Sequence, residues 1–199
     1  MKAKFMNNTI AFLKKYNTYS DYEIEKLEYG IEGVYLTFTK LIFIFIAAMC
    51  LGIVLELIAL LFFFNVIRYT GFGFHAEKSY QCLIFSSLCF LLIPLLFINL
   101  ELSRGVYIVI SCLCIISYLL FAPADTVKRP LPNKKKRIIR KVITIIIGII
   151  YAIFSIIYFN SWISPVLISA LILQAIVINP LVYMLFKQPY NNYKNYKSD

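Results

Sequence analysis

The stretch "LIFIFIAAMCLGIVLELIALLFFF", Leu41 to Phe64, decides the class of fold. It holds 24 residues with a single charged side chain, that of Glu56. A helix needs about 20 apolar residues to cross the hydrocarbon core of a membrane. Because the stretch is continuously apolar and does not alternate, it predicts helix and not the strands of a membrane barrel. Further apolar stretches follow at 83–100, 105–122, 142–159 and 162–186.

The composition points the same way. Of 199 residues, 61% are hydrophobic and 15% are charged, whereas soluble domains are nearer half apolar and a quarter charged. A water-soluble fold could not hide that much apolar surface, so we expect an all-α, polytopic integral membrane protein. Residues 1–30 are mostly polar, so no secretory signal peptide is expected. The net charge of +10 suggests cytoplasmic loops rich in Lys and Arg. The basic residues form no recognisable motif for reading nucleic acid.

The topology depends on a basic segment, "TVKRPLPNKKKRIIRK", at residues 126–141. It has eight Lys or Arg and no acidic residue, which predicts a cytoplasmic position. Counting back two spans then puts the 65–82 loop in the cytoplasm as well. One span at 41–64 would leave the lysine-bearing N-terminus outside. If residues 31–69 instead form two helices with a break at Cys50–Gly52, about six spans result and both termini are cytoplasmic.

This division has a consequence for two charged residues. Lys40 and Glu56 would lie inside the helices, where charges usually pair or face a cavity. In the last apolar stretch, four residues interrupt the hydrophobic run: Pro165, Gln174, Asn179 and Pro180. They indicate either a kinked helix whose polar groups bond to neighbours or the wall of a cavity.

The chain is expected to have three parts. Residues 1–30 predict amphipathic, peripheral helices, with Ser20 and Glu23 spaced as a capping box. Residues 31–189 predict a membrane domain, with functional loops at 68–82 and 123–141. Residues 190–199 predict a polar, flexible tail.

The loop "GFGFHAEKSYQC", Gly71 to Cys82, holds the chain's one histidine, His75. Cys82 stands where this polar loop becomes an apolar helix. With Ser79 as N-cap, Cys82 is the third helical residue, where unpaired N–H groups and partial positive charge favour a thiolate. The other cysteines lie in apolar stretches as small hydrophobes and suggest neither disulfides nor a metal site: Cys50, Cys89, Cys112 and Cys114.

His75 can serve Cys82 as a general base only if the backbone between them turns. Seven residues of continuous helix rise about 10 Å, whereas proton transfer needs a separation of about 3 Å. Gly71 and Gly73 favour irregular backbone at this point. The sequence therefore predicts a non-helical segment between His75 and Cys82 if the two act as a pair.

Two motifs resemble the accessory gene regulator B (AgrB) family. "RYTGFGFHAEKSYQC", Arg68 to Cys82, is similar to the family's His-x6-Cys element. "FAPADTVKRPLPNKKKRIIRK", Phe121 to Lys141, looks like its "YAPA" helix end with the proline- and lysine-rich loop that follows. Length, number of spans and a polar N-terminal helix also match, so the resemblance covers nearly the whole chain. Some members carry further histidines where this chain has Thr70 and Phe72, which leaves His75 as the sole candidate.

The resemblance implies a multi-pass cell-membrane enzyme of Gram-positive bacteria with its active site on the cytoplasmic side. It would be a cysteine endopeptidase that processes an AgrD-like propeptide into a cyclic autoinducing peptide for quorum sensing. That propeptide has an amphipathic helix, a ring segment and an acidic tail. By position, Cys82 would be the nucleophile and His75 the general base. Residues matching other motif positions would contact substrate: Arg68, Gly73, Lys134, Lys135 and Lys136.

The sequence says less about cofactors, partners and a third catalytic group. No cofactor or metal ion is expected, membrane lipids are expected partners, and the resemblance allows a homodimer. No third catalytic group is identifiable, since Glu77, Ser79 and Gln81 fit caps or loop positions. The basic cluster at 128–141 suits an acidic substrate tail or lipid headgroups.

Two other function classes remain. The first is a non-enzymatic peptide exporter or accessory transport subunit, favoured by the interrupted last stretch but lacking an ATP-binding motif. The second is an unrelated cysteine enzyme, such as an acyltransferase that uses the same His75 and Cys82 pair.

Overall fold

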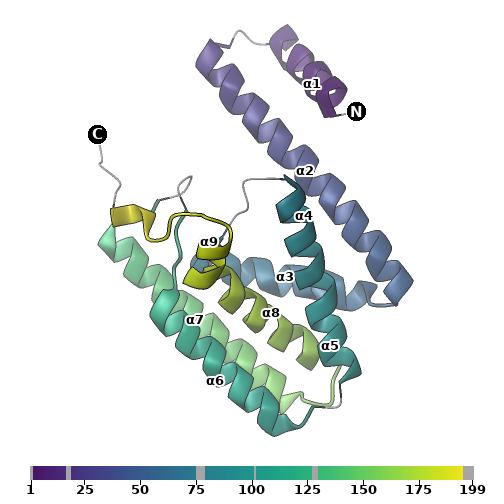
Figure 1. The fold of residues 1–199 in the computed structure, drawn as a ribbon, viewed down its shortest axis with the longest axis vertical. Helices are drawn as coiled ribbons and strands as arrows, with labels where there is room; N and C mark the ends of the chain where they lie inside the picture. Colours follow the sequence, from purple (N-terminus) through teal and green to yellow (C-terminus); the bar gives the residue numbers. More distant parts are fainter. Residues whose placement is uncertain (1, 17–18, 75–78, 101, 127–129, 195–199) are drawn as a thin grey trace. The chain divides into compact units, whose positions relative to one another are not determined.

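The computed structural model describes residues 2–16, 19–74, 79–100, 102–126 and 130–194. It divides into two units, Met1–Ala47 and Ala48–Asp199, each described here by itself. The described residues form helices and no named strand (Figure 1). The α-helices are α1 (Lys2–Tyr16), α2 (Asp21–Leu51), α3 (Val54–Gly71), α4 (Ser79–Ser87), α5 (Ile93–Asn99), α6 (Arg104–Phe121), α7 (Lys134–Ile157), α8 (Ile163–Ile178) and α9 (Pro180–Leu185). A π-helical turn, Leu88–Leu92, joins α4 to α5, and a 3-10 turn spans Asn192–Lys194.

The start of α2 confirms the expected capping box. The backbone N–H and the hydroxyl of Ser20 both donate to the Glu23 carboxylate, each at 2.9 Å. The Glu23 N–H donates back to the Ser20 hydroxyl at 3.4 Å. These bonds satisfy donors that a helix start leaves unpaired. From there α2 continues without a break to Leu51, so the amphipathic segment and the apolar stretch after it form one helix.

The predicted break in the first apolar stretch is confirmed at Gly52. α2 ends at Leu51, Gly52 has a φ of +71°, and α3 begins at Val54. A residue without a Cβ adopts this left-handed backbone at little steric cost. The Ile53 N–H closes the turn by donating to the Ala48 carbonyl at 3.0 Å.

Five helical segments in the described chain are long and apolar enough to cross a membrane: Gly33–Leu51, Val54–Gly71, Tyr80–Asn99, Arg104–Phe121 and Lys134–Ile157. The expected final stretch at 162–186 is not one helix. It divides into α8 and α9 at Asn179, whose side chain accepts a hydrogen bond from the Leu181 N–H at 2.9 Å and so caps α9. Pro180 then occupies the first helical position, where its missing N–H is harmless.

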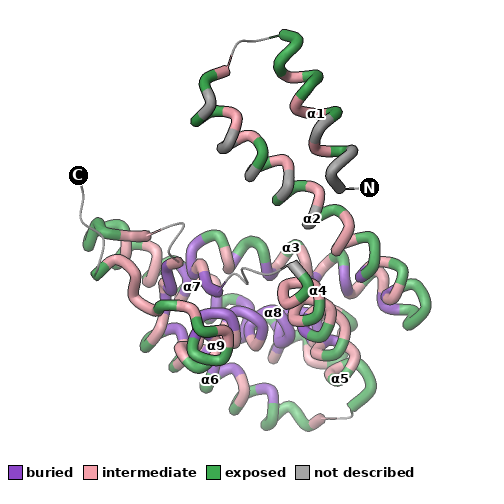
Figure 2. Tube along the Cα trace, turned by 45° about the horizontal axis from the view of Figure 1, so that its top comes forward, coloured by how far each residue is buried: buried purple, intermediate pink, exposed green. Residues whose placement is uncertain are grey.

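Helix α8 is the core of the second unit. It packs against α3, α5, α6 and α7, and most of its residues are buried (Figure 2). Side-chain hydroxyls satisfy main-chain carbonyls within this core: for example, Tyr118 donates to Leu171 at 2.6 Å, and Tyr151 donates to Phe63 at 3.2 Å. Such bonds matter in a membrane, where no water is present to solvate an open carbonyl.

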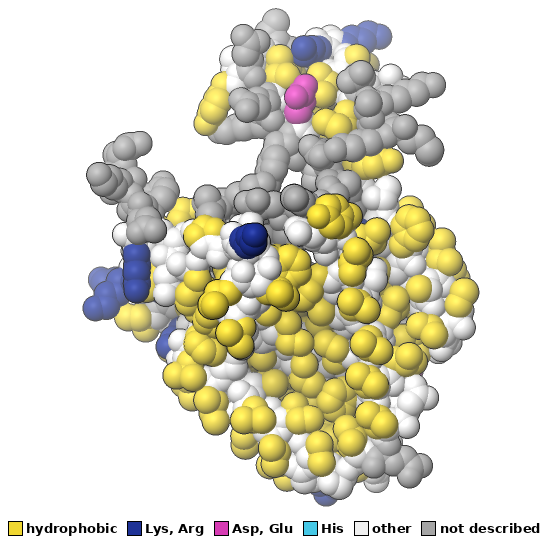
Figure 3. All heavy atoms as spheres, in the orientation of Figure 1, with side chains coloured by type: hydrophobic (Ala, Val, Ile, Leu, Met, Phe, Trp, Pro, Cys, Tyr) yellow, Lys and Arg dark blue, Asp and Glu magenta, His cyan; other side chains and the backbone are white. Residues whose placement is uncertain are grey.

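The outside of the second unit is apolar. Hydrophobic side chains cover most of the face of this unit drawn in Figure 3. Large apolar residues on α3, α6 and α7 are exposed, among them Phe62, Leu113 and Ile157. A bundle with an apolar exterior is suited to lipid and not to water, so the chain is an all-α membrane protein, as the composition predicts.

Candidate active site

The backbone around the predicted catalytic loop is not one continuous helix. α3 ends at Gly71, residues 72–74 are not helical, and α4 begins at Ser79. The chain therefore leaves the helical path after Gly71 and is helical again from Ser79. Because residues 79–82 are helical, the non-helical segment predicted between His75 and Cys82 could lie only within residues 75–78, and it stays a prediction. His75 and Glu77 lie outside the described residues, so the distance between the imidazole and the sulfur stays a prediction.

Residues 72–74, called here the clamped segment, are held from two sides. Gly73 donates its N–H to the Ala124 carbonyl at 2.9 Å, and Ala124 donates to the Gly71 carbonyl at 3.1 Å. On the other side the Phe74 N–H donates to the Val177 carbonyl at 2.7 Å. The backbone leading to His75 is therefore fixed by residues far away in the sequence.

Two side chains complete the clamp. Gln174, fully buried on α8, donates its amide to the Phe72 carbonyl at 3.1 Å. Arg68 donates from Nη2 to the Phe74 carbonyl at 2.9 Å, and its guanidinium lies over the Phe64 ring at 5.3 Å. The Phe74 ring is buried against Phe186.

The clamped segment has unusual backbone geometry. Phe72 has φ 54° and ψ −141°, and Gly73 has a φ of +128°. A side chain at φ 54° is uncommon and persists only where the surroundings impose it. The bonds from Ala124, Val177 and Gln174 provide that constraint, and strained backbone of this kind is frequent at active sites.

Cys82 is the fourth residue of α4, in its first turn, and is partly buried. The sequence-based expectation placed it third, with Ser79 as N-cap; the helix in fact begins at Ser79. Cys82 still lies at the positive end of the helix. Its sulfur lies 3.9 Å from the Ser86 hydroxyl, one turn later.

Arg68 connects the clamped segment to Cys82. Its guanidinium bonds the Phe74 carbonyl and lies close enough to Cys82 and Tyr183 to interact with both electrostatically. The resemblance implied a substrate contact for Arg68. The structure adds a second role, because Arg68 holds the Phe74 carbonyl just before His75.

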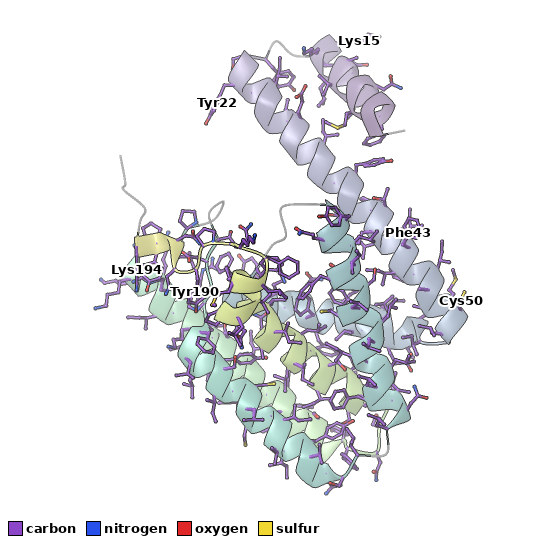
Figure 4. The ribbon with its side chains drawn as sticks, in the orientation of Figure 1. Lys15, Tyr22, Phe43, Cys50, Tyr190 and Lys194 are labelled. Carbon is purple, nitrogen blue, oxygen red and sulfur yellow. The ribbon has the colours of Figure 1, made fainter. Side chains whose placement is uncertain are left out.

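The other cysteines differ from Cys82. Cys89 and Cys114 are buried, whereas Cys50 and Cys112 are exposed on apolar helices (Figure 4 labels Cys50). All are free thiols. Among the described residues no cluster of His, Cys, Asp or Glu could hold a metal ion.

The predicted basic residues Lys134, Lys135 and Lys136 are exposed on the first turn of α7. The Asn133 side chain caps this turn by accepting from the Lys136 N–H at 3.1 Å. None of the three lysines lines the pocket beside the clamped segment. That pocket, of about 560 Å³, is lined by Arg140 instead, together with Arg68, Tyr69, Gly73 and Leu131.

A buried carboxylate, missed by the sequence reading, organises the loop after α6. Asp125 is 2% exposed. It accepts hydrogen bonds from the N–H groups of Tyr193 at 2.7 Å, Asn192 at 2.9 Å and Leu131 at 3.3 Å. These bonds attach the C-terminal segment, in which Figure 4 labels Tyr190 and Lys194, to the loop that pairs with residues 71–73.

Two aromatic side chains reinforce that attachment. Tyr190 donates its hydroxyl to the Phe121 carbonyl at 3.3 Å. Burial, and then the nearby Tyr193 and Asp125, raise the pKa of Tyr190 to about 12, so it remains a donor at neutral pH. The Arg137 guanidinium stacks 3.7 Å from the Tyr193 ring centre. Flexibility of residues 190–199 stays a prediction, and its last five residues lie outside the described part.

The sequence is similar to proteins of one family along most of its length. The family model described as "Accessory gene regulator B" matches residues 6–178. A putative AgrB-like protein of Listeria innocua is 30% identical over 176 residues, covering 86% of this chain and 84% of the relative. One from Clostridium acetobutylicum is 28% identical over 187 residues, covering 93% and 88%.

A more distant relative carries the family's full name. The accessory gene regulator protein B of Staphylococcus aureus is 25% identical over 173 residues, covering 86% of this chain and 91% of the relative. No solved structure shows a significant match. The family match includes the clamped segment, Cys82 and the basic start of α7, so this chain is a member of the AgrB family.

Proposed function

We propose that this protein is a membrane cysteine endopeptidase that removes the C-terminal tail of a quorum-sensing propeptide. Membership of the AgrB family supports the broader role, in the processing of a quorum-sensing peptide. The observation that carries the finer proposal is the position of Cys82. It lies in the first turn of α4, within electrostatic range of Arg68, and the backbone of residues 72–74 just before His75 is held by hydrogen bonds to Ala124 and Val177.

In the proposed reaction, His75 takes the proton of the Cys82 thiol. The thiolate attacks the peptide carbonyl that joins the ring segment to the tail, and the tail leaves as an amine that takes up the proton from His75. A thioester between the peptide and Cys82 remains. A cysteine or serine within the bound peptide attacks this thioester, closes a thiolactone or lactone ring and releases the Cys82 thiol.

The energetics favour a sheltered site. Conversion of the amide to a thioester is uphill, whereas exchange of the thioester for a thiolactone keeps the bond type and is near balance. Removal of the tail or of the product must therefore draw the reaction forward. Water would hydrolyse the thioester, and a site beneath the membrane surface limits that loss.

The helix start supplies groups for the oxyanion. The first N–H groups of α4 have no partner within the helix, and donors of this kind stabilise the charge that develops on an attacked carbonyl. The exposed lysines at the start of α7 favour a cytoplasmic position for this end of the bundle. The proposal therefore places the chemistry at the cytoplasmic surface of a multi-pass protein.

The test first looks in the neighbouring reading frame for a short propeptide with an amphipathic start, a central Cys or Ser and an acidic end, and uses it as the substrate. Cys82→Ala and His75→Ala should each abolish tail release, measured by mass spectrometry after co-expression. Cys82→Ser should still bind the propeptide but turn over poorly. Cys112→Ala, on an exposed surface of α6, is the matched control and should cut normally. Normal tail release by Cys82→Ala would rule out the proposed nucleophile.

A further inference from the structure

The pocket beside the clamped segment is basic. It lies between the end of α3, the first turns of α7 and the loop after α6, with a volume of about 560 Å³. Two guanidinium groups, those of Arg68 and Arg140, line it, together with the polar side chains Asn65 and Thr126. No acidic side chain is among its lining residues in the described chain. Its volume is in the usual range for small-ligand sites.

Arg140 is positioned for an anion. It donates from Nη1 to the Tyr69 carbonyl at 2.8 Å and lies 4.5 Å from the centre of the Phe72 ring. Its contacts among the described residues are this carbonyl and the rings of Phe72 and Tyr69, with no carboxylate. A guanidinium has five N–H donors in a flat fork that matches a carboxylate. The bond to Tyr69 holds the fork in place and leaves donors for a ligand.

The pocket shares residues with the surroundings of the proposed catalytic pair. Phe72 and Gly73, which precede His75 in the chain, line it. Arg68 lines the pocket and also interacts electrostatically with Cys82. A peptide whose reacting carbonyl is at Cys82 would therefore place its neighbouring residues past Arg68 and toward Arg140.

We infer that this pocket binds an acidic side chain in the leaving tail of the propeptide, with Arg140 as the main contact. The inference rests on the proposed function and narrows the basic cluster at 128–141 to one residue, Arg140, that lines the pocket. The three exposed lysines of α7 do not line the pocket, so they and Arg140 would act on different parts of the tail. Because Phe72 and Gly73, which precede His75, line the pocket, we infer a peptide and not a lipid headgroup as the occupant.

A binding measurement tests the inference without turnover. The Cys82→Ala protein in phosphatidylcholine nanodiscs is titrated with fluorescein-labelled Glu-Ala-Glu-Ala-Glu or with the matched Gln-Ala-Gln-Ala-Gln, and binding is followed by polarisation. The acidic probe should bind about tenfold more tightly, as expected for one charge-assisted pair. Adding Arg140→Gln should remove most of that preference.

The control is another arginine at the opposite end of the same unit. Arg104, at the start of α6, stacks on Phe159 and does not line this pocket. Arg104→Gln should keep the preference for the acidic probe. If Arg140→Gln also keeps it, the inference is wrong. If phosphatidylglycerol displaces the acidic probe and binds in an Arg140-dependent way, the occupant is a lipid headgroup and the peptide assignment is overturned.

Charge reversal gives the second readout. Arg140→Glu should release the natural tail at least tenfold more slowly, and lysines in place of the acidic tail residues should restore cleavage. If Arg140→Glu does not fold, the Arg140→Gln titration decides alone. Failure of the proposed function can be told apart from failure of this inference. Tail release by Cys82→Ala would refute the nucleophile but would leave the binding comparison intact.

Discussion

Gly73 lies directly against Val177. A Cβ atom added to Gly73 would come 2.9 Å from the Val177 carbonyl oxygen and 2.8 Å from its Cγ2. The same carbonyl accepts the Phe74 N–H, so the close approach and the hydrogen bond depend on each other. The resemblance implied that Gly73 contacts substrate. The structure shows in addition that the packing against Val177 leaves no room for a side chain at this position.

Gly73→Ala should therefore lower tail release by tenfold or more. The new methyl group must displace the Val177 backbone, and the φ of +128° is unfavourable for any residue with a Cβ. Cleavage rates of purified protein in nanodiscs measure the effect. Gly30→Ala is the control, because nothing lies within 4 Å of its added Cβ and the residue is within a helix. Equal rates for Gly73→Ala and the natural protein would contradict the close packing.

Gln174→Met should lower cleavage activity and change stability only slightly. The change removes the amide that holds the Phe72 carbonyl, so the clamped segment loses an anchor and tail release should fall about threefold to tenfold. Stability should change by less than about 1.5 kcal/mol, because Met has a similar volume and the Gln174 Oε1 has no hydrogen-bond partner among the described residues. Thermal unfolding and cleavage are measured on the same sample.

Another buried polar side chain provides the comparison for Gln174. Ser111 Oγ likewise lacks a partner in the described part of the chain but lies on α6, away from the clamped segment. Ser111→Ala should alter neither property. A Gln174→Met protein that cuts at the natural rate would show that the Phe72 bond does not position the loop.

Asp125→Asn should release the C-terminal segment. The carboxylate accepts three backbone N–H groups, and an amide group in its place would turn a donor toward at least one of them. The expected loss is about 1–3 kcal/mol of stability. Amide hydrogen exchange should accelerate at Asn192 and Tyr193 in particular. Tyr190→Phe, which loses a single 3.3 Å bond from a partly buried hydroxyl, should have a smaller effect, and the reverse order would argue against Asp125 as the central attachment.

Gly148→Ala should weaken the contact between α6 and α7. The added Cβ would come 2.7 Å from the Tyr118 ring, whose hydroxyl bonds the Leu171 carbonyl on α8. Small residues at such positions allow membrane helices to approach closely. A loss of about 1–3 kcal/mol in unfolding is expected from the overpacking. Gly105→Ala on α6, whose nearest neighbour would be 3.8 Å away, is the control and should melt as the natural protein does.

Several features were predictable from the sequence because they depend on short-range patterns. Apolar length predicted the membrane helices, Ser20 and Glu23 predicted the capping box, and Gly52 marked the break between α2 and α3. The start of a helix just before Cys82 was also predicted, with an error of one residue. Each of these depends on residues within a few turns of one another, so local sequence carries the information.

The clamp around residues 72–74 was decided only by the tertiary structure. Ala124, Gln174 and Val177 lie 51 to 103 positions away from the residues they hold. In a chain that is 61% hydrophobic, hydropathy does not tell which side of a helix faces protein and which faces lipid, because both sides are apolar. Gln174, Asp125 and Arg140 acquire their roles from burial and from partners across the fold, and no local pattern specifies either.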